Sequence, residues 1–141
     1  MINLIVITHG EFGAYLVEAA EWIVGQQSQG VEVISISPKT ALNKVKENLN
    51  EAITRNNSRD GLIFMTDMLG GTPTNMVLPL SRDLPKSAVI CGININMLVS
   101  AFSYRTAMNL EDLVKKILED GRKSICDVKT LLKMRAASHI S

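Results

Sequence analysis

The segment Leu4-Ile5-Val6-Ile7-Thr8-His9-Gly10 decides the fold. Its first five residues form an uninterrupted aliphatic and β-branched run, which is typical of a strand buried on both faces of a parallel sheet. The run stops at His9 and Gly10, which indicate a loop. Apolar residues at helical spacing follow from about residue 14 to Val24, and Gly25 is a plausible end for that helix. The chain therefore opens with a strand, a loop and a helix.

The same alternation continues along the chain. Further buried strands are expected at 31–36, 62–65 and 87–91, and helices at about 42–55, 73–80, 96–105 and 110–121. Thr40 is the expected cap of the second helix. This order predicts an α/β fold of three layers, α/β/α, around a mostly parallel central sheet with strand order 2-1-3-4. Residues 124–129 could form a last strand, giving one domain at 1–132 and a C-terminal tail at 133–141.

Composition narrows the function classes. Hydrophobic residues make up 46% and charged residues 21%, as in ordinary folded proteins, and 15 basic against 14 acidic residues leave a net charge of +1. That balance gives no electrostatic footprint for nucleic acid. Two histidines and two cysteines are too few for a multi-ligand metal site or cluster, so no metal and no cofactor are expected.

The compartment is inferred from the cysteines and the first strand. Cys91 and Cys126 lie in apolar runs and are expected to be inert thiols in strand interiors. The apolar start of the chain is too short for a signal sequence or a membrane span. A cytoplasmic protein is therefore expected.

His9 and Asp67 are the residues best placed for chemistry. They end the first and third strands, which are neighbours in the predicted order, at the edge of a parallel sheet where ligands bind. An imidazole with a pKa of about 6.5 is largely neutral at pH 7, so one nitrogen can attack phosphorus while the other donates to a carboxylate. The other histidine, His139, lies in the polar tail and is expected to have no function.

The segment after Asp67 could hold a phosphoryl group. Gly70 and Gly71 allow close approach of the backbone, Thr72 and Thr74 offer hydroxyls, and Thr72 with Pro73 predicts a helix start whose free N–H groups favour anions. Between residues 67 and 75 there is no Lys or Arg. We expect a phosphoryl group to be held there by neutral donors, as suits a carrier that must release it.

Three other phosphate chemistries fit poorly. A nucleotide-binding P-loop needs Gly-Lys-Ser/Thr, whereas Thr72-Pro73 follows Gly71. A phosphoaspartate receiver needs acidic magnesium ligands after the first strand, where this chain has Thr8-His9. A mutase-like phosphatase would carry Arg immediately before the catalytic histidine, a position occupied here by Thr8.

Three motifs together resemble one known family. They are Thr8-His9-Gly10, the segment Asp67-Met68-Leu69-Gly70-Gly71-Thr72-Pro73-Thr74-Asn75, and Gly92-Ile93-Asn94-Ile95-Asn96-Met97-Leu98. Together they resemble the EIIA component of the mannose-type (mannose, fructose, sorbose) phosphoenolpyruvate-dependent sugar phosphotransferase system.

That resemblance implies a phosphotransferase activity and a set of partners. His9 would take a phosphoryl group from phospho-HPr on Nε2 and pass it to a histidine of EIIB, while Asp67 bonds Nδ1. The membrane proteins EIIC and EIID would act indirectly, at the sugar itself. The resemblance also implies a homodimer in which residues 124–129 cross to pair with the sheet of the other subunit.

Two positions depart from the family pattern, and other functions stay open. Leu69 stands where some relatives carry Trp, and Asn96 where many carry Pro, so Asn96 is expected to cap the fourth helix. A regulatory phosphorylation module, not coupled to sugar transport, would use the same His9 chemistry. A small-ligand binding module without phosphoryl transfer is a third possibility. The identity of the sugar does not follow from the sequence.

Overall fold

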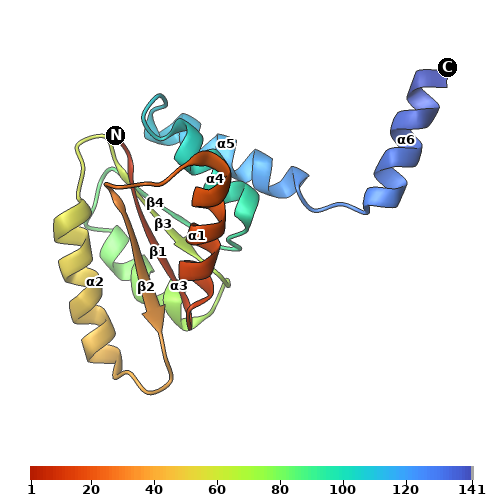
Figure 1. The fold of residues 1–141 in the computed structure, drawn as a ribbon. Coiled ribbons are helices and arrows are strands. Elements are labelled where there is room, and N and C mark those ends of the chain that lie inside the picture. Colours follow the sequence, from red (N-terminus) through yellow and green to blue (C-terminus); the bar gives the residue numbers. More distant parts are fainter. Residues whose placement is uncertain (141) are drawn as a thin grey trace.

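The computed structural model describes residues 1–140, without the side chains of residues 139 and 140, so the expectation for His139 falls outside the described part. Strands and helices alternate from the N-terminus to the fourth helix (Figure 1). In chain order the elements are β1 (Asn3–His9), α1 (Phe12–Val24), β2 (Val31–Ile36), α2 (Leu42–Asn56), β3 (Leu62–Thr66), α3 (Thr72–Ser81), β4 (Ser87–Ile90), α4 (Ile95–Tyr104), α5 (Leu110–Lys123) and α6 (Val128–Ile140).

The four strands form one parallel sheet in the order β2-β1-β3-β4, which confirms the predicted fold class and strand order. Strand β1 lies between β2 and β3, with His9 opposite Ile36 and Ile7 opposite Thr66. Because β1 and β3 are adjacent and parallel, their carboxyl ends meet at one edge of the sheet. His9 and Asp67 are thereby brought to the same place.

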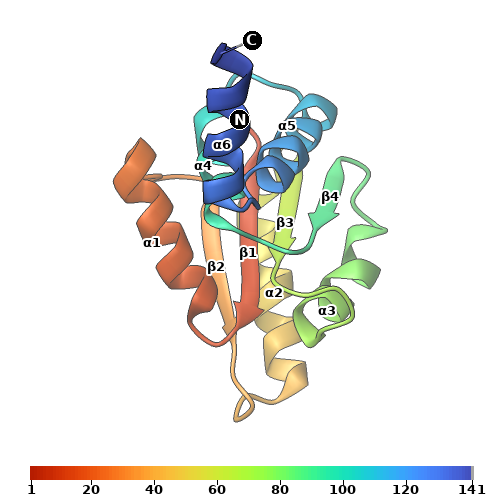
Figure 2. The same ribbon diagram turned by 90° about the vertical axis from the view of Figure 1, so that its right-hand side faces the viewer.

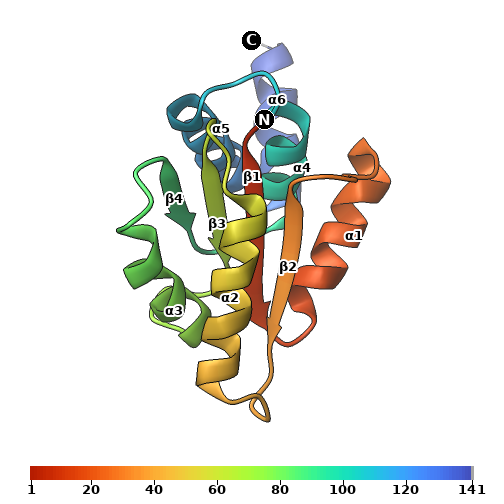
Figure 3. The same ribbon diagram turned by 90° about the vertical axis from the view of Figure 1, so that its left-hand side faces the viewer.

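Helices cover both faces of the sheet and enclose two apolar cores (Figures 2 and 3). Alternate side chains of a strand point to opposite faces, so Leu4 and Val6 enter one core while Ile5 and Ile7 enter the other. Helices α1, α4 and α5 pack on the first face, and α2 and α3 on the second. This double covering explains why β1 is apolar at consecutive positions.

Three helix caps differ from the sequence prediction, and α1 begins at Phe12 rather than at about residue 14. Gly71, rather than Thr72, is the N-cap of α3, because Gly71 is the last extended residue before the helix. Ala41, rather than Thr40, precedes α2, and no side chain caps that helix. Asn94, rather than Asn96, caps α4, and its side chain accepts a hydrogen bond of 3.0 Å from the amide of Met97.

The strand predicted at 124–129 is not formed within the single chain, and its exchange between two copies stays a prediction. Residues 124–127 form no regular strand, and α6 begins at Val128 (Figure 1). Asp127 explains the helix start, because its carboxylate accepts hydrogen bonds from the amides of Lys129 (3.1 Å) and Thr130 (3.4 Å). The expected tail is thus helical, and the expected boundary at residue 132 falls inside α6.

The cysteine prediction also needs correction. Cys126 is exposed in the segment before α6, because the strand expected to bury it is not formed. Cys91 is half-buried just after β4, and both thiols are free. Among the described residues, no helix is both long and apolar enough to cross a membrane.

Candidate functional site

The candidate site lies at the carboxyl ends of β1 and β3. The helix that follows β1 packs on one face of the sheet and the helix that follows β3 packs on the other, which opens a crevice between these two strands. His9 is the last residue of β1, and Asp67 directly follows β3. The predicted pairing of these two residues therefore has a structural basis in the strand order.

One carboxylate oxygen of Asp67 binds His9 twice. Oδ2 lies 2.8 Å from Nδ1 of the His9 ring and accepts a hydrogen bond of 2.9 Å from the His9 backbone amide. An ionised carboxylate only accepts hydrogen bonds, so Nδ1 carries the proton. Nε2 then keeps its lone pair. Half of the His9 side chain is exposed, so Nε2 is free to react with a molecule outside the protein.

The electrostatics of Asp67 favour the charged form. Burial is the largest influence on the pKa of Asp67 and raises it. The hydrogen bonds from the His9 amide and ring, together with the positive charge of a protonated His9, outweigh burial and hold the pKa of Asp67 below its ordinary value of 3.8. Asp67 is therefore a carboxylate at neutral pH and stabilises positive charge on the ring.

Gly70 and Gly71 bring the backbone close to the ring. Gly70 has φ +79°, which side-chain-bearing residues rarely adopt. A Cβ atom on Gly71 would lie 3.0 Å from Cε1 of His9, so the ring packs directly over this glycine. The side-chain amide of Asn75 donates to the Gly70 carbonyl at 3.2 Å and ties the turn to α3.

The two threonines predicted to bind a phosphoryl group have different surroundings. Thr72 is exposed and lines a pocket of about 340 Å³ together with His9. Thr74 is 3% exposed, and its hydroxyl donates to the Met68 carbonyl at 2.6 Å and lies 2.6 Å from the hydroxyl of Thr66. Thr72 therefore stays with the site, whereas Thr74 holds the loop from below and has no free hydroxyl to offer.

Two other segments contribute to the site without having been predicted to do so. The buried hydroxyl of Thr8 accepts a hydrogen bond of 2.8 Å from the amide of Gly13 and fixes the start of α1 relative to His9. The turn after β2, with Ser37 and Thr40, lines the pocket beside His9. The position of this turn at the end of a strand next to β1 was the available signal in the sequence.

The third sequence motif, Gly92 to Leu98, holds the end of β3 in place rather than contributing a side chain to the site. The amide of Ile93 donates to the carbonyl of Thr66 at 3.1 Å, which ties the loop after β4 to the end of β3. Exposed apolar side chains lie close in the chain to His9 and Asp67: Phe12, the first residue of α1, is 47% exposed, and Met68 and Leu69, in the loop after β3, are 59% and 80% exposed. Among the described residues, no group of three or more His, Cys, Asp or Glu side chains could hold a metal ion.

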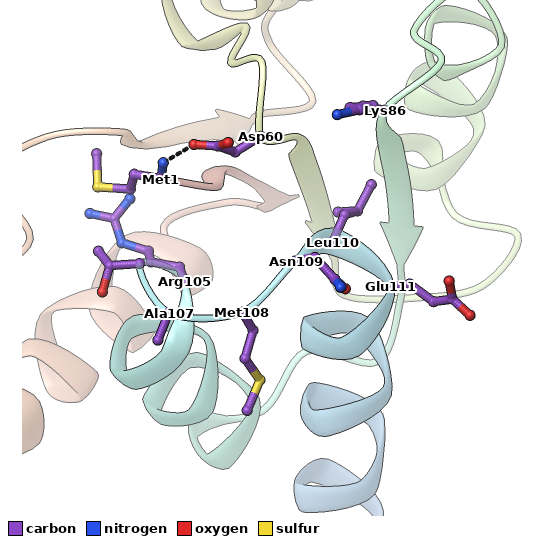
Figure 4. Close-up of a pocket in the computed structure, with 10 residues that line it drawn as sticks. Met1, Asp60, Lys86, Arg105, Ala107, Met108, Asn109, Leu110 and Glu111 are labelled. Atoms are coloured by element: carbon purple, nitrogen blue, oxygen red, sulfur yellow. Dashed lines mark hydrogen bonds and ion pairs between the residues drawn. The ribbon is translucent and has the colours of Figure 1, made fainter.

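A pocket of about 500 Å³ lies far from this pair, at the amino-terminal ends of the strands (Figure 4). There the N-terminal amine of Met1 contacts Asp60, and Arg105 lines the wall. The Arg105 guanidinium is buried and donates to the Gln27 side chain (2.9 Å) and to the Ile2 carbonyl (3.2 Å). These contacts hold the N-terminus and neighbouring turns in place, and no histidine or cysteine whose side chain is described lines this pocket.

The fold and the site define a class: an α/β protein with a histidine–carboxylate pair at the switch point of a parallel sheet. The model of the family described as "PTS system fructose IIA component" matches residues 3–118. The chain therefore belongs to the EIIA family of the mannose and fructose type of the sugar phosphotransferase system. Components of this family are phosphotransferases, and the resemblance drawn from the three motifs is confirmed.

Relatives of known name agree with this assignment. The chain is 29% identical over 129 residues to the mannose-specific EIIAB component of Escherichia coli K12. The aligned region covers 91% of this chain but only 40% of that longer relative. It is 24% identical over 124 residues to the fructose-specific EIIA component of Bacillus subtilis, covering 88% of this chain and 84% of that one.

Two solved structures share the fold. An EIIA component from Streptococcus agalactiae has a TM-score of 0.83 at 30% identity, with 92% of this chain and 99% of that chain covered. A PTS IIA protein associated with the fucose utilization operon of Streptococcus pneumoniae has a TM-score of 0.82 at 26% identity, covering 93% and 96%.

Proposed function

We propose that the protein is a phosphocarrier in which His9 accepts a phosphoryl group from phospho-HPr and donates it to a histidine of EIIB during sugar uptake. The observation that carries this proposal is the contact of 2.8 Å between Nδ1 of His9 and Oδ2 of Asp67. It leaves Nε2 as the nucleophile at an exposed edge of the sheet. Membership of the EIIA family supports the direction of transfer, and the partners HPr and EIIB follow from that membership.

The transfer is a displacement between two nitrogen atoms. The lone pair of Nε2 attacks phosphorus, the nitrogen–phosphorus bond of the donor histidine breaks, and its electron pair returns to the donor ring. The ring of His9 gains positive character as the new bond forms, while Nδ1 keeps its proton and donates it in a hydrogen bond to Asp67. The second transfer, to EIIB, runs the same steps in reverse on His9. Asp67 orients the ring and stabilises the charge in both.

The phosphorylated form needs donors for about two negative charges. The candidate donors are the hydroxyl of Thr72, which lines a pocket with His9, and the first backbone amides of α3, which has no side-chain cap; Gly71 lets this backbone lie close to the ring. One helix start contributes only about 0.3–1 kcal/mol when exposed, so several donors must act together. Held by neutral groups, the phosphoryl group can be passed on readily.

Protein partners would meet the exposed apolar side chains beside His9. With a net charge of +1, the chain has no strong overall field to steer an encounter. Phe12, Met68 and Leu69 instead offer a local docking surface for HPr and EIIB. Leu69, which departs from the family pattern, lies on this surface and not among the reacting groups.

The direct test is phosphorylation in vitro. Incubation with phosphoenolpyruvate, enzyme I and HPr should give an acid-labile, base-stable phosphate on the protein. His9→Ala should abolish the label, and His139→Ala, which removes the other histidine, should retain it. Unchanged labelling of His9→Ala would remove His9 as the acceptor, whereas a wild-type protein that takes up no label would leave the small-ligand binding module as the better explanation.

The same labelling is expected of a regulatory module in an incomplete phosphotransferase system. The two functions differ in the membrane partners, since sugar uptake requires EIIC and EIID. Their presence among the neighbouring genes, and loss of sugar uptake when this gene is deleted, would separate transport from regulation. Both versions use the protein in the cytoplasm, where the phosphoryl donor HPr is phosphorylated.

A further inference from the structure

The pocket beside His9 has a second wall that the glycine-rich turn does not supply. It is formed by the turn between β2 and α2, and residues from that turn share the cavity of about 340 Å³ with His9 and Thr72. Among the described residues, no Lys, Arg, Asp or Glu lines this cavity. A phosphoryl group on Nε2 that enters this cavity must therefore be met by hydroxyls, backbone groups and apolar side chains.

The geometry of this turn is set by local chemistry. The amide of Thr40 donates to the carbonyl of Ser37 at 3.0 Å, which closes a β-turn with Pro38 at its second position. The hydroxyl of Ser37 accepts a hydrogen bond of 3.2 Å from the amide of Lys39 and locks the same turn from the side chain. Thr40 is thus held in place before any ligand arrives.

The hydroxyl of Thr40 has no hydrogen-bond partner among the residues that the structure describes. It does not cap α2, since that helix has no side-chain cap. The hydroxyl of Thr72 is in the same situation at the start of α3. Two residues with unengaged hydroxyls, Thr40 before α2 and Thr72 at the start of α3, therefore line one cavity with His9.

We propose that Thr40 donates a hydrogen bond to an oxygen of the phosphoryl group on His9, so that Thr40 and Thr72 hold that group between two elements. The proposal rests on the phosphocarrier function. No bond is made or broken by Thr40. Its hydroxyl hydrogen-bonds the phosphoryl oxygen only in the phosphorylated protein, so it stabilises that form relative to the free one.

The test is the equilibrium constant for phosphoryl transfer between phospho-HPr and this protein, measured by ³¹P nuclear magnetic resonance. An equilibrium constant depends only on the free and phosphorylated forms of each protein, so it is insensitive to how the two proteins dock. Thr40→Val keeps the shape of the side chain and removes the hydroxyl. It should reduce the equilibrium constant about tenfold, as expected for loss of a hydrogen bond to a charged group.

Two variants serve as controls. Thr40→Ser keeps a hydroxyl and should restore most of the equilibrium constant. Thr106→Val removes a threonine hydroxyl from an exposed loop that lines the remote pocket of Figure 4, and it should leave the constant within twofold of the wild-type value. The melting temperature of each variant, measured in parallel, reports whether the protein is folded.

Two results would overturn the role of Thr40. One is an equilibrium constant for Thr40→Val as close to wild type as that of Thr106→Val. The other is slower transfer with an unchanged constant, which would assign Thr40 to docking. Either result leaves the phosphocarrier function intact, whereas a wild-type protein that accepts no phosphoryl group on His9 removes that function itself.

Discussion

Asp67 contacts His9 through a single carboxylate oxygen, so the substitution Asp67→Asn tests its role with little change in side-chain size. Its Oδ2 atom holds both the ring nitrogen and the backbone amide of His9. An amide in its place keeps the size of the side chain but removes the charge, and it can orient the ring with the wrong nitrogen protonated. We therefore expect Asp67→Asn to slow phosphoryl transfer without unfolding the protein.

We expect Asp67→Asn to slow phosphoryl transfer from phospho-HPr roughly 100-fold, the scale of contribution typical of a positioned acid–base partner. Rapid-quench measurement of the phosphorylated fraction checks the rate, and circular dichroism checks the fold. A transfer rate equal to that of wild type would show that Asp67 has only a structural role in the loop after β3.

The same substitution predicts a dependence of stability on pH. Because the pKa of Asp67 is lowered by folding, its contribution to stability is fully present above the ordinary value of 3.8 and is lost as pH falls through the lower, folded-state value. The stability that the Asp67 carboxylate supplies, measured as the difference in free energy of unfolding between wild type and Asp67→Asn, should be lost in the acid range. The loss should appear below about pH 4 in urea unfolding at a series of pH values. A difference independent of pH down to pH 2 would contradict the lowered pKa.

Gly70 and Gly71 are adjacent yet constrained for different reasons, which gives a matched pair of variants. Gly71→Ala places a methyl group 3.0 Å from Cε1 of His9, so the ring must shift by a few tenths of an ångström. We expect transfer to fall severalfold with little change in stability. Gly70→Ala meets no atom within 4 Å but is strained at φ +79°, so it should cost about 1–2 kcal/mol of stability. Transfer assays and urea unfolding of both variants would expose a reversed pattern.

Two capped helices differ in how they pack: α4 is part of the apolar core, whereas α6 is not. Asn94 caps α4, whose buried residues belong to the larger apolar core. Asp127 caps α6, which stands away from the body of the molecule in Figure 1. Caps of similar chemistry should therefore have different thermodynamic consequences.

Asn94→Ala should cost about 1 kcal/mol and lower the melting temperature of the whole protein by a few degrees. Asp127→Ala should leave that melting temperature unchanged and reduce only the helical circular dichroism signal, because α6 frays without unfolding the sheet. A large drop in melting temperature for Asp127→Ala would mean that α6 packs against the core in solution.

The strands were predicted from the sequence more accurately than the helix caps. All four strands of the sheet were predicted within about one residue, because each is an apolar run that two covering layers require. Helix starts were misplaced by one or two residues at Thr40, Thr72 and Asn96, since capping depends on which residue is the last extended one. The strand expected at 124–129 is not formed within the single chain because a strand needs a neighbour, and α6 instead begins on the carboxylate of Asp127.

For the whole molecule, the homodimer with exchanged C-terminal segments stays a prediction. It is compatible with the free edge of β4 and with a C-terminal segment that stands away from the sheet (Figure 1). Among the residues that the structure describes, strand β4 pairs only with β3. If two copies exchange residues 124–129, light scattering should give twice the chain mass of 15.5 kDa. A variant ending at residue 123 should then be a monomer. A full-length protein that stays monomeric at all concentrations tested would exclude the exchange.

The amino-acid sequence was enough to predict the alternation of strands and helices, the strand order and the meeting of His9 and Asp67 at one edge of the sheet. Those features follow from local apolar periodicity and from the rule that ligands bind where parallel strands end. Which threonine hydroxyls are available at the candidate site depends instead on how the chain packs. The tertiary structure buried Thr74 beneath the loop and brought Thr40, 31 residues after His9, to the pocket. The physical reason is that side-chain availability depends on what packs around it, which residue spacing along one chain does not encode.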